Sequence, residues 1–344
     1  MNPHSIELCC GAARAEVALR GAELRRWSVG PTPLLWEKDP AYWDETAPIL
    51  FPLVGWTRGG ARVAGKTFPL GLHGFARAMN FAGETLTPAR ARFTLISGAE
   101  SLALYPFPFR LCVDYCLSER DLTTSLTVKN RGVGPMPYAC GLHPGFRWPF
   151  AGGAWNDYSI WFSAPEDPFA PEISAQGLFL KSRRRVPLQG QKLALTPELF
   201  AAEALCFLNA RSHGLRFQHA GGAALAIETS DFPHFALWSK PQANFLSIEC
   251  WTGHGDPEDF HGDLFDAGRR RASWRALFLC SRADALKGLP LPERGCLNFR
   301  VPVEGGDSWR ENPKPCRRRR ERRISPAFAP APSQASAGPP SASS

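Results

Sequence analysis

The sequence predicts an all-β fold, a large antiparallel sandwich, and three observations support this prediction. Apolar and polar residues alternate over 110–118, and the same pattern returns over 122–128 after a short polar link. Turn-forming residues separate many further short segments of this kind. A helical pattern is confined to residues 197–204. Many short strands with very little helix are typical of sandwiches built from antiparallel sheets.

The remaining elements follow one another as short strands and ordered loops. Residues 5–27 predict a three-stranded meander with a turn at Gly11, and the glycines of 59–65 predict a small hairpin. Prolines flank the apolar segment 47–52, which favours an extended loop over a helix. Later strands are expected at 138–143, 215–219, 223–229, 235–240, 245–251 and 273–280.

Composition divides the chain into two parts. We predict one β-sandwich domain over residues 1–286 and a disordered tail rich in Pro, Ser and Ala over 287–344. The tail holds 11 Lys or Arg and 5 Asp or Glu, so it carries +6 of the net charge of +8 and leaves +2 for the domain. A nearly neutral domain does not require a polyanionic partner. Nucleic acid could bind only through the basic run 316–323, for which we favour a solvated tail.

Cysteine usage and hydropathy indicate the compartment. The ten cysteines have irregular spacings and no C-x-x-C pair, which favours reduced core residues over a disulfide framework or a zinc site. No segment approaches the roughly 18 to 20 uninterrupted apolar residues of a membrane span. We therefore expect a cytoplasmic protein without membrane contact, as a monomer or homodimer.

His143 is the first candidate for chemistry, because the following Pro144 excludes it from helical geometry. On a strand over 138–143 it shares a face with only Ala139 and Gly141, which would leave room for a ligand. The alternative is a buried histidine that is hydrogen-bonded inside the core.

Glu249 is the second candidate. Alternation along 245–251 places Ser247, Glu249 and Trp251 on one face of a strand. A carboxylate among apolar neighbours is either paired or has a raised pKa, and a raised pKa suits a general base. Trp251 offers a flat plate on which the C–H face of a sugar ring could rest. The alternative role for Glu249 is a salt bridge.

Other polar residues are weaker candidates. His73 and Arg77, four residues apart, could converge on a polar ligand or cap a loop. The acidic and histidine-rich segment 254–263 fits no known metal cage, so we interpret it as a polar surface loop and predict no metal site. The absence of a phosphate-binding glycine loop, a G-x-S-x-G elbow and an H-E-x-x-H motif argues against nucleotide, hydrolase and zincin functions.

Seven short motifs in order resemble the aldose 1-epimerases, or galactose mutarotases, in particular their bacterial aldose 1-epimerase-like branch. The resemblance covers roughly residues 6–281 and rests on Gly21-Ala-Glu-Leu, Leu35-Trp-Glu, Ala47-Pro-Ile-Leu-Phe-Pro, His73-Gly-Phe-Ala-Arg77, Gly141-Leu-His-Pro, Leu237-Trp-Ser-Lys240 and Ile248-Glu-Cys-Trp251. It implies a β-supersandwich with few short helices and cofactor-free interconversion of the α and β anomers of a hexose.

The resemblance also implies roles for individual residues. His143 matches the general acid of the family and Glu249 its general base, while His73 and Arg77 match sugar-binding positions. Glu203 lies near the place of a substrate-anchoring carboxylate.

Three residues depart from the family pattern. Trp56 stands where relatives usually have a sugar-contacting arginine, a role that Arg58 could take over. Gly145 replaces a larger residue, and Cys250 replaces a proline. The departure at Trp56 favours the alternative function, a non-catalytic or sugar-phosphate-directed carbohydrate-binding protein of the same fold.

Overall fold

Three antiparallel sheets build the fold, which the computed structural model describes for residues 4–266, 270–272 and 295–300, all within the first of two units of the chain, residues 1–309. The largest sheet has nine strands in the order β18 (Lys192–Ala194), β15 (Tyr158–Phe162), β20 (Gly214–His219), β21 (Ala224–Ser230), β25 (Gly295–Arg300), β11 (Asp121–Asn130), β10 (Phe109–Leu117), β9 (Arg90–Ile96) and β8 (Ala82–Thr87). The predicted all-β class is thereby confirmed.

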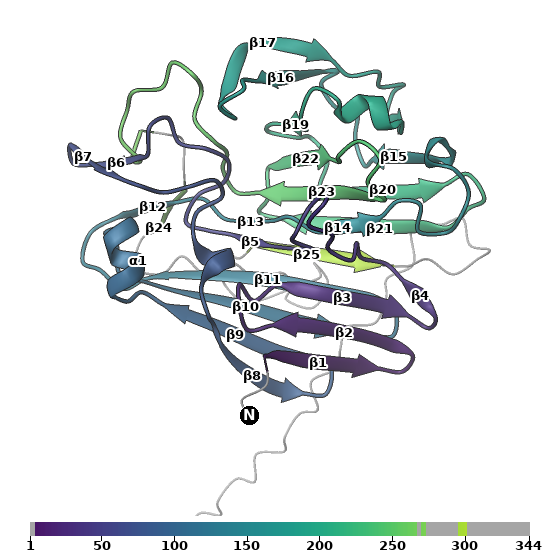
Figure 1. Ribbon diagram of the computed structural model, residues 1–344, viewed down its shortest axis with the longest axis horizontal. Helices are drawn as coiled ribbons and strands as arrows, with labels where there is room; N and C mark the ends of the chain where they lie inside the picture. Colours follow the sequence, from purple (N-terminus) through teal and green to yellow (C-terminus); the bar gives the residue numbers. More distant parts are fainter. Residues whose placement is uncertain (1–3, 267–269, 273–294, 301–344) are drawn as a thin grey trace, which may run out of the picture. The chain divides into compact units, whose positions relative to one another are not determined.

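Two smaller sheets complete the sandwich (Figure 1). The six-stranded sheet has the order β19 (Leu205–Phe207), β22 (His234–Trp238), β23 (Phe245–Trp251), β13 (Gly141–Leu142) and β5 (Ile49–Leu50), with β14 (Gly145–Arg147) also on β23. The four-stranded sheet is β1 (Ser5–Cys10), β2 (Ala13–Ala18), β3 (Leu24–Val29) and β4 (Thr32–Pro33). Figure 1 shows β1–β3 layered over β9–β11.

The remaining elements are short. Three two-stranded ribbons pair β6 (Ala61–Val63) with β7 (Lys66–Phe68), β12 (Met136–Tyr138) with β24 (Arg270–Ala272), and β16 (Phe169–Ile173) with β17 (Phe179–Arg185). The helices are η1 (Ala76–Ala78), α1 (Ala99–Leu104), η2 (Trp155–Asp157) and η3 (Pro197–Phe200). None of the helices in the described ranges has the length and hydropathy that a membrane span requires.

One hydrophobic core joins the nine-stranded sheet to the two smaller sheets. The alternation in β10 buries Val113 and Tyr115, and the Tyr115 hydroxyl donates a hydrogen bond of 2.7 Å to the backbone oxygen of Ala22 beside the four-stranded sheet. Ile248 of β23 belongs to the same core. The side chains on the opposite face of β23 are therefore directed away from this core.

Several predicted elements need correction. The single strand expected over 138–143 is divided, because β12 ends at Tyr138 and β13 comprises only Gly141–Leu142. The short helix α1 was not predicted. The strand expected over 273–280 lies outside the described residues, whereas β25 lies within the range 287–344 that we assigned to the tail. The division of the chain at residue 287 and the disorder of the tail outside β25 stay predictions.

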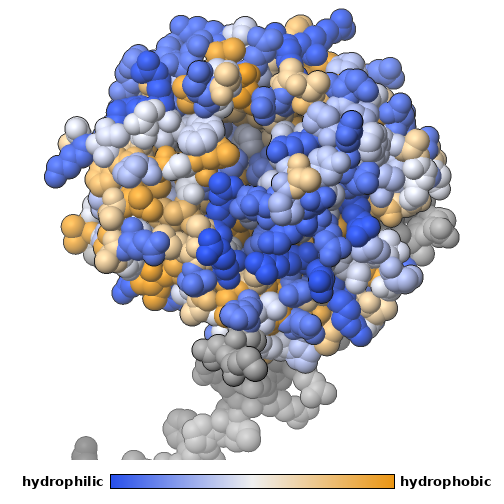
Figure 2. All heavy atoms as spheres, viewed as in Figure 1, coloured by the Kyte–Doolittle hydropathy of each residue, from blue (hydrophilic) through white to orange (hydrophobic). Residues whose placement is uncertain are grey.

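The outer surface on the viewed face is mixed in character. Figure 2 shows hydrophilic residues gathered over the centre and right of this face, and apolar residues toward its left, on the side of α1. Cys112, Cys140, Cys206 and Cys250 are buried.

Candidate functional site

The register of β23 with its neighbours places His143 opposite Glu249. β13 pairs Gly141 with Trp251, and β14 continues on the same strand with the same offset after two unpaired residues. His143 lies in that two-residue interval, so it faces Glu249 across the sheet. Side chains directly opposite in an antiparallel pair have Cβ atoms only about 4.5 to 5.5 Å apart. Strand pairing alone therefore brings the imidazole and the carboxylate together.

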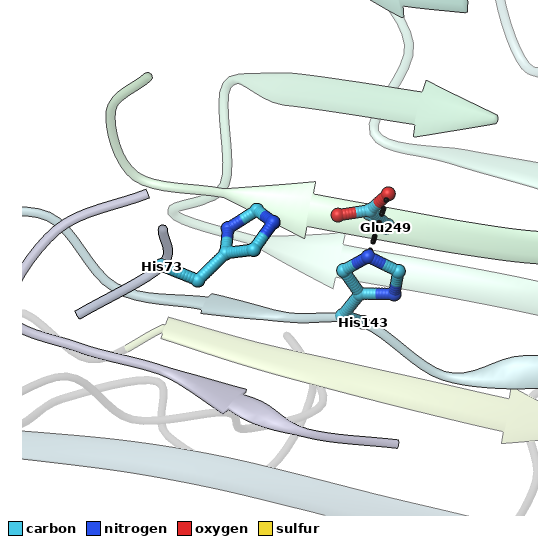
Figure 3. Close-up of side chains that lie close together, drawn as sticks. All are labelled: His73, His143 and Glu249. Carbon is cyan, nitrogen blue, oxygen red and sulfur yellow. Dashed lines mark ion pairs between the residues drawn. The ribbon is translucent and has the colours of Figure 1, made fainter. Parts of the chain in front are cut away.

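The two side chains are in direct contact (Figure 3). Nε2 of His143 lies 3.2 Å from Oε1 of Glu249. The exposed fractions of their side chains are 9% and 4%, respectively. The structure therefore places the two groups in contact and leaves little of either exposed.

Each member of the pair has a second partner on its other side. The Trp251 indole N–H donates to Oε2 of Glu249 at 3.0 Å, which directs Oε1 toward the histidine. The hydroxyl of Ser247 lies 2.9 Å from Nδ1 of His143. Both rings and the carboxylate are thereby fixed in orientation before any ligand binds.

Burial controls the proton affinities of the pair. Burial raises the pKa of Glu249 well above its usual 4.5 and lowers the pKa of His143 from 6.5 to about 3. The neighbouring Glu249 does not hold the pKa of His143 up, because desolvation disfavours the charged imidazole more strongly.

The short distance between the two side chains suits an ion pair, whereas the pKa directions favour two uncharged groups. These two states are tautomers of each other. A carboxylic acid beside a neutral imidazole holds the same number of protons as a carboxylate beside an imidazolium. We favour the uncharged arrangement at rest, because burial opposes both charges. One proton moving across 3.2 Å converts it to the ion pair.

His73 is the third side chain at this place. It has a φ of +62°, and the following Gly74 a φ of +72° with the oxygen of Phe51 only 2.3 Å from where a Cβ would stand, so this turn needs glycine. Its ring lies 5.5 Å from the ring of His143 and nearly perpendicular to it. Burial lowers the pKa of His73 well below 6.5, with smaller contributions from the neighbouring His143 and from the positive charge of Arg77.

The proton of neutral His73 lies on Nε2. Its Nδ1 accepts a hydrogen bond from the backbone N–H of Gly55 at 3.1 Å, so Nδ1 has no proton of its own. An imidazole with this tautomer presents an N–H donor toward the pair (Figure 3).

That tautomer bears on metal binding. The potential ligand atoms of His73, His143 and Glu249 all lie within 4.8 Å of one another, the one such group among the described residues. A metal needs a lone pair on Nε2 of His73, which would require moving its proton to the nitrogen that already faces the Gly55 N–H. The arrangement favours an oxygen ligand that accepts hydrogen bonds over a cation.

Tryptophan side chains fill the space beside the two glycines that lie near His143. A Cβ on Gly141 would meet Trp251 at 2.8 Å, and one on Gly145 would meet Trp43 at 2.7 Å. Trp43 lies face to face with His143 at 5.0 Å, tilted by 36°. We expected Ala139 and Gly141 to leave room for a ligand, and this expectation is wrong for the space at Gly141, which Trp251 fills.

A small cavity lies on the core side of the same segment. Its lining belongs largely to the hydrophobic core and not to the face that carries Glu249: it comprises Leu24, Ala47, Ile49, Tyr115, Thr124, Leu142, His143 and Pro144. We do not assign it to a ligand.

Two of the other predicted residues lie close to the pair. Arg77 is near enough to lower the pKa of His143, and it forms an ion pair of 2.7 Å with Glu45. Trp251 contacts Glu249, but only 5% of it is exposed, so it has little surface to offer a sugar.

Arg58 and Glu203 are not connected to the pair by any described contact. The exposed Arg58 side chain lies 2.8 Å from Nδ1 of His261, and the exposed Glu203 has a φ of +69° and accepts a hydrogen bond from Arg184 through its backbone oxygen. In the segment 254–263, which we interpreted as a polar surface loop, Asp256 is buried and accepts a hydrogen bond from the backbone N–H of Arg58.

Sequence reasoning missed Ser247, Trp43, Glu45 and Trp238. Alternation already placed Ser247 on the face of Glu249, so its position could have been used. Nothing local indicates that Trp43, 100 residues before His143 in the sequence, stacks on that ring, or that the ring of Trp238 lies 5.8 Å from it.

Comparisons with known proteins identify the family of the chain. The family model of aldose 1-epimerases matches residues 4–243. The protein LacX of Lactococcus lactis is 35% identical over 232 residues, 64% of this chain and 77% of LacX.

Solved structures show the same fold. A galactose mutarotase-like protein from Lactobacillus casei is 25% identical with a TM-score of 0.76, over 86% of this chain and 99% of that one. A galactose mutarotase related enzyme from Lactobacillus acidophilus, 23% identical, has a TM-score of 0.74 over 87% and 97% of the two chains.

Proposed function

The chain belongs to the aldose 1-epimerase family, and we propose that it interconverts the α and β anomers of a hexose by opening and reclosing the sugar ring. The observation that carries the proposal is the contact of 3.2 Å between Nε2 of His143 and Oε1 of Glu249. An acid and a base held this close can act on two neighbouring atoms of one substrate.

The chemistry of mutarotation requires such neighbours. Ring opening removes the proton of the anomeric hydroxyl and delivers a proton to the ring oxygen, and both oxygens are bonded to the same carbon, C1. A catalyst that acts on both at once therefore needs its proton acceptor and its proton donor side by side. Two groups at distant ends of a cleft could not do this.

The proposed reaction starts from the ion-pair tautomer. Glu249 as a carboxylate takes the hydroxyl proton while the His143 imidazolium donates from Nε2 to the ring oxygen, so the C1–O5 bond breaks and the C1 oxygen becomes a carbonyl. Rotation about C1–C2 and the reverse transfers close the ring as the other anomer. Each positioned transfer contributes about 10²- to 10⁴-fold.

Substrate binding would use the donors around the pair. The Nε2 proton of His73 can bond to a sugar oxygen, and Arg77, with Glu45 beside it, offers a donor and an acceptor for neighbouring hydroxyls. Arg58 and Glu203 remain proposed sugar contacts that would require movement of their segments. The protein exchanges only protons with the sugar in this reaction, so the reaction needs no cofactor.

The test follows anomer exchange directly. Polarimetry or NMR of fresh α-glucose and α-galactose should show faster equilibration with the wild type, and His143→Ala and Glu249→Gln should each reduce kcat by about 10²-fold or more. His213→Ala is the matched control, because His213 is exposed and away from the pair. Equal rates for wild type and His143→Ala would exclude His143 from the mechanism.

A second function keeps the fold without catalysis. The low exposure of the pair, together with Trp56, which is 39% exposed in place of an arginine, favours a sugar-binding protein. Such a protein would change tryptophan fluorescence on titration with sugar but would leave the rate of anomer exchange unchanged.

A further inference from the structure

Ser247 is completely buried beside the pair and is not explained by the packing of the core. It lies on β23 two residues before Glu249, on the same face, with no exposed surface. Its Oγ is 2.9 Å from Nδ1 of His143 and 3.3 Å from the backbone oxygen of Pro144. A buried hydroxyl between two polar atoms has a definite hydrogen-bond direction.

The two partners of the hydroxyl fix that direction. A hydroxyl donates one hydrogen bond, and a carbonyl oxygen can only accept. If Ser247 donates to Pro144, its lone pairs face Nδ1, and the imidazole must then supply the proton to that contact. This arrangement satisfies the hydroxyl as donor and as acceptor at the same time.

The other side of the imidazole requires the same arrangement. Oε2 of Glu249 accepts the indole N–H of Trp251, so a proton on the carboxyl group lies on Oε1 and points at Nε2 of His143. Nε2 then has to accept. The protons of the three contacts then follow one direction, from the Glu249 carboxyl toward Nε2 and from Nδ1 through Ser247 to Pro144.

We propose that Ser247 is a positioning residue that holds the proton of neutral His143 on Nδ1, so that Nε2 is the ring atom that exchanges protons with Glu249 and with the sugar. The catalytic consequence rests on the proposed function. The tautomer itself is a property of the free protein and does not depend on any activity.

The same contact serves the charged form. When His143 takes up the second proton on Nε2, its Nδ1–H keeps the Ser247 oxygen as acceptor and no buried N–H is left without a partner. The ring therefore does not have to turn during the reaction. Without the hydroxyl, neutral His143 would have no acceptor for Nδ1–H there and would favour the tautomer with the proton on Nε2.

The first experiment reads the tautomer by ¹⁵N NMR of uniformly labelled full-length protein at neutral pH, with the His143 signals assigned by their loss in His143→Gln. We expect a protonated Nδ1 and an unprotonated Nε2 in the wild type, and a shift of both signals toward the opposite tautomer in Ser247→Ala. A wild-type ring protonated on Nε2, or an unchanged tautomer in Ser247→Ala, would overturn the proposal.

The matched control is Ser239→Ala. Ser239 is also buried, with 3% exposure, and its hydroxyl donates to the backbone oxygen of Phe245 at 2.7 Å without touching His143. It removes a comparable buried hydroxyl from the same sheet. We expect the His143 signals and the anomer exchange rate of this variant to match those of the wild type.

Kinetics supply the second readout. We expect Ser247→Ala to lower kcat by about 10- to 100-fold, up to the lower limit of what a general acid supplies, while KM changes less than about twofold. Ser247→Thr, which keeps the hydroxyl, should retain the wild-type tautomer and recover kcat. A Ser247→Ala variant with wild-type kcat and tautomer contradicts the inference, whereas a wild type without activity contradicts only the proposed function, and the NMR result still decides the role of Ser247.

Discussion

His143 and Glu249 face each other across two antiparallel strands, with Nε2 and Oε1 3.2 Å apart. Because the pair carries one exchangeable proton in either tautomer, its net charge is zero over a broad range of pH. The buried site thus contains an acid and a base side by side without a net buried charge.

The first prediction concerns the pH dependence of stability. In the unfolded chain Glu249 titrates near 4.5 and His143 near 6.5, whereas the folded pair holds one proton because burial raises the first pKa and lowers the second to about 3. Above pH 6.5 the unfolded state binds fewer protons than the pair, so stability falls as pH rises. Below pH 4.5 the unfolded state binds more, so stability falls as pH falls.

Chemical denaturation across pH checks this prediction. Relative to the double variant His143→Gln/Glu249→Gln, the free energy of unfolding of the wild type should be greatest between pH 4.5 and 6.5. Outside that window the difference should fall by up to about 1.4 kcal/mol per pH unit. If the difference in the free energy of unfolding does not vary with pH, burial does not keep one proton on the pair.

The second prediction concerns Trp251 as the support of Glu249. Trp251→Phe removes the indole donor to Oε2, which helps to lower the pKa of Glu249. We expect that pKa to rise further, kcat to fall by about tenfold or more, and stability to fall by about 1 to 3 kcal/mol.

Trp161→Phe is its control, since this indole bonds only to Ser159 on the nine-stranded sheet. Substrate titrations should separate the two possible roles of Trp251. A sugar-binding plate would raise KM when replaced, whereas a support of Glu249 lowers kcat with little change in KM.

The third prediction concerns Gly145, one of the departures from the family pattern. A Cβ at this position lies 2.7 Å from Trp43, so Gly145→Ala should push Trp43 away from His143 and cost about 1 to 3 kcal/mol of stability. The double variant with Trp43→Phe should recover part of this loss, which a double-mutant cycle measures. Gly134→Ala, with nothing within 4 Å of the added Cβ, is the control.

The sequence was sufficient to identify His143 and Glu249 as candidates, but it did not predict the contact between them. Alternation correctly put Ser247, Glu249 and Trp251 on one face of β23, because a strand has a strict period of two. Pairing between segments 106 residues apart depends on register, which no local pattern encodes. The roles of His143 and Glu249 were therefore expected from a family resemblance, and their direct contact was not predicted.

Burial was the property that sequence reasoning judged least well. Trp251 was predicted to offer a flat surface, and Gly145 was predicted only as a departure of unknown effect. The structure shows that the indole turns to Glu249 and that the missing side chain of Gly145 makes room for Trp43. Both facts depend on which large side chain fills which small space, and that is decided by tertiary packing.

The last prediction concerns Arg77, whose charge lowers the pKa of both His73 and His143. Arg77→Met should raise both values and should also raise the pKa of Glu45, because Arg77 opposes the effect of burial on that carboxyl. The ion pair is partly exposed, so we expect less than about 1 kcal/mol of lost stability. If Arg77 binds sugar, KM should rise by about tenfold while kcat changes little. Arg92→Met breaks a comparable ion pair with Asp114 on the nine-stranded sheet and should leave KM unchanged, and equal KM values for the two variants would remove Arg77 from the binding site.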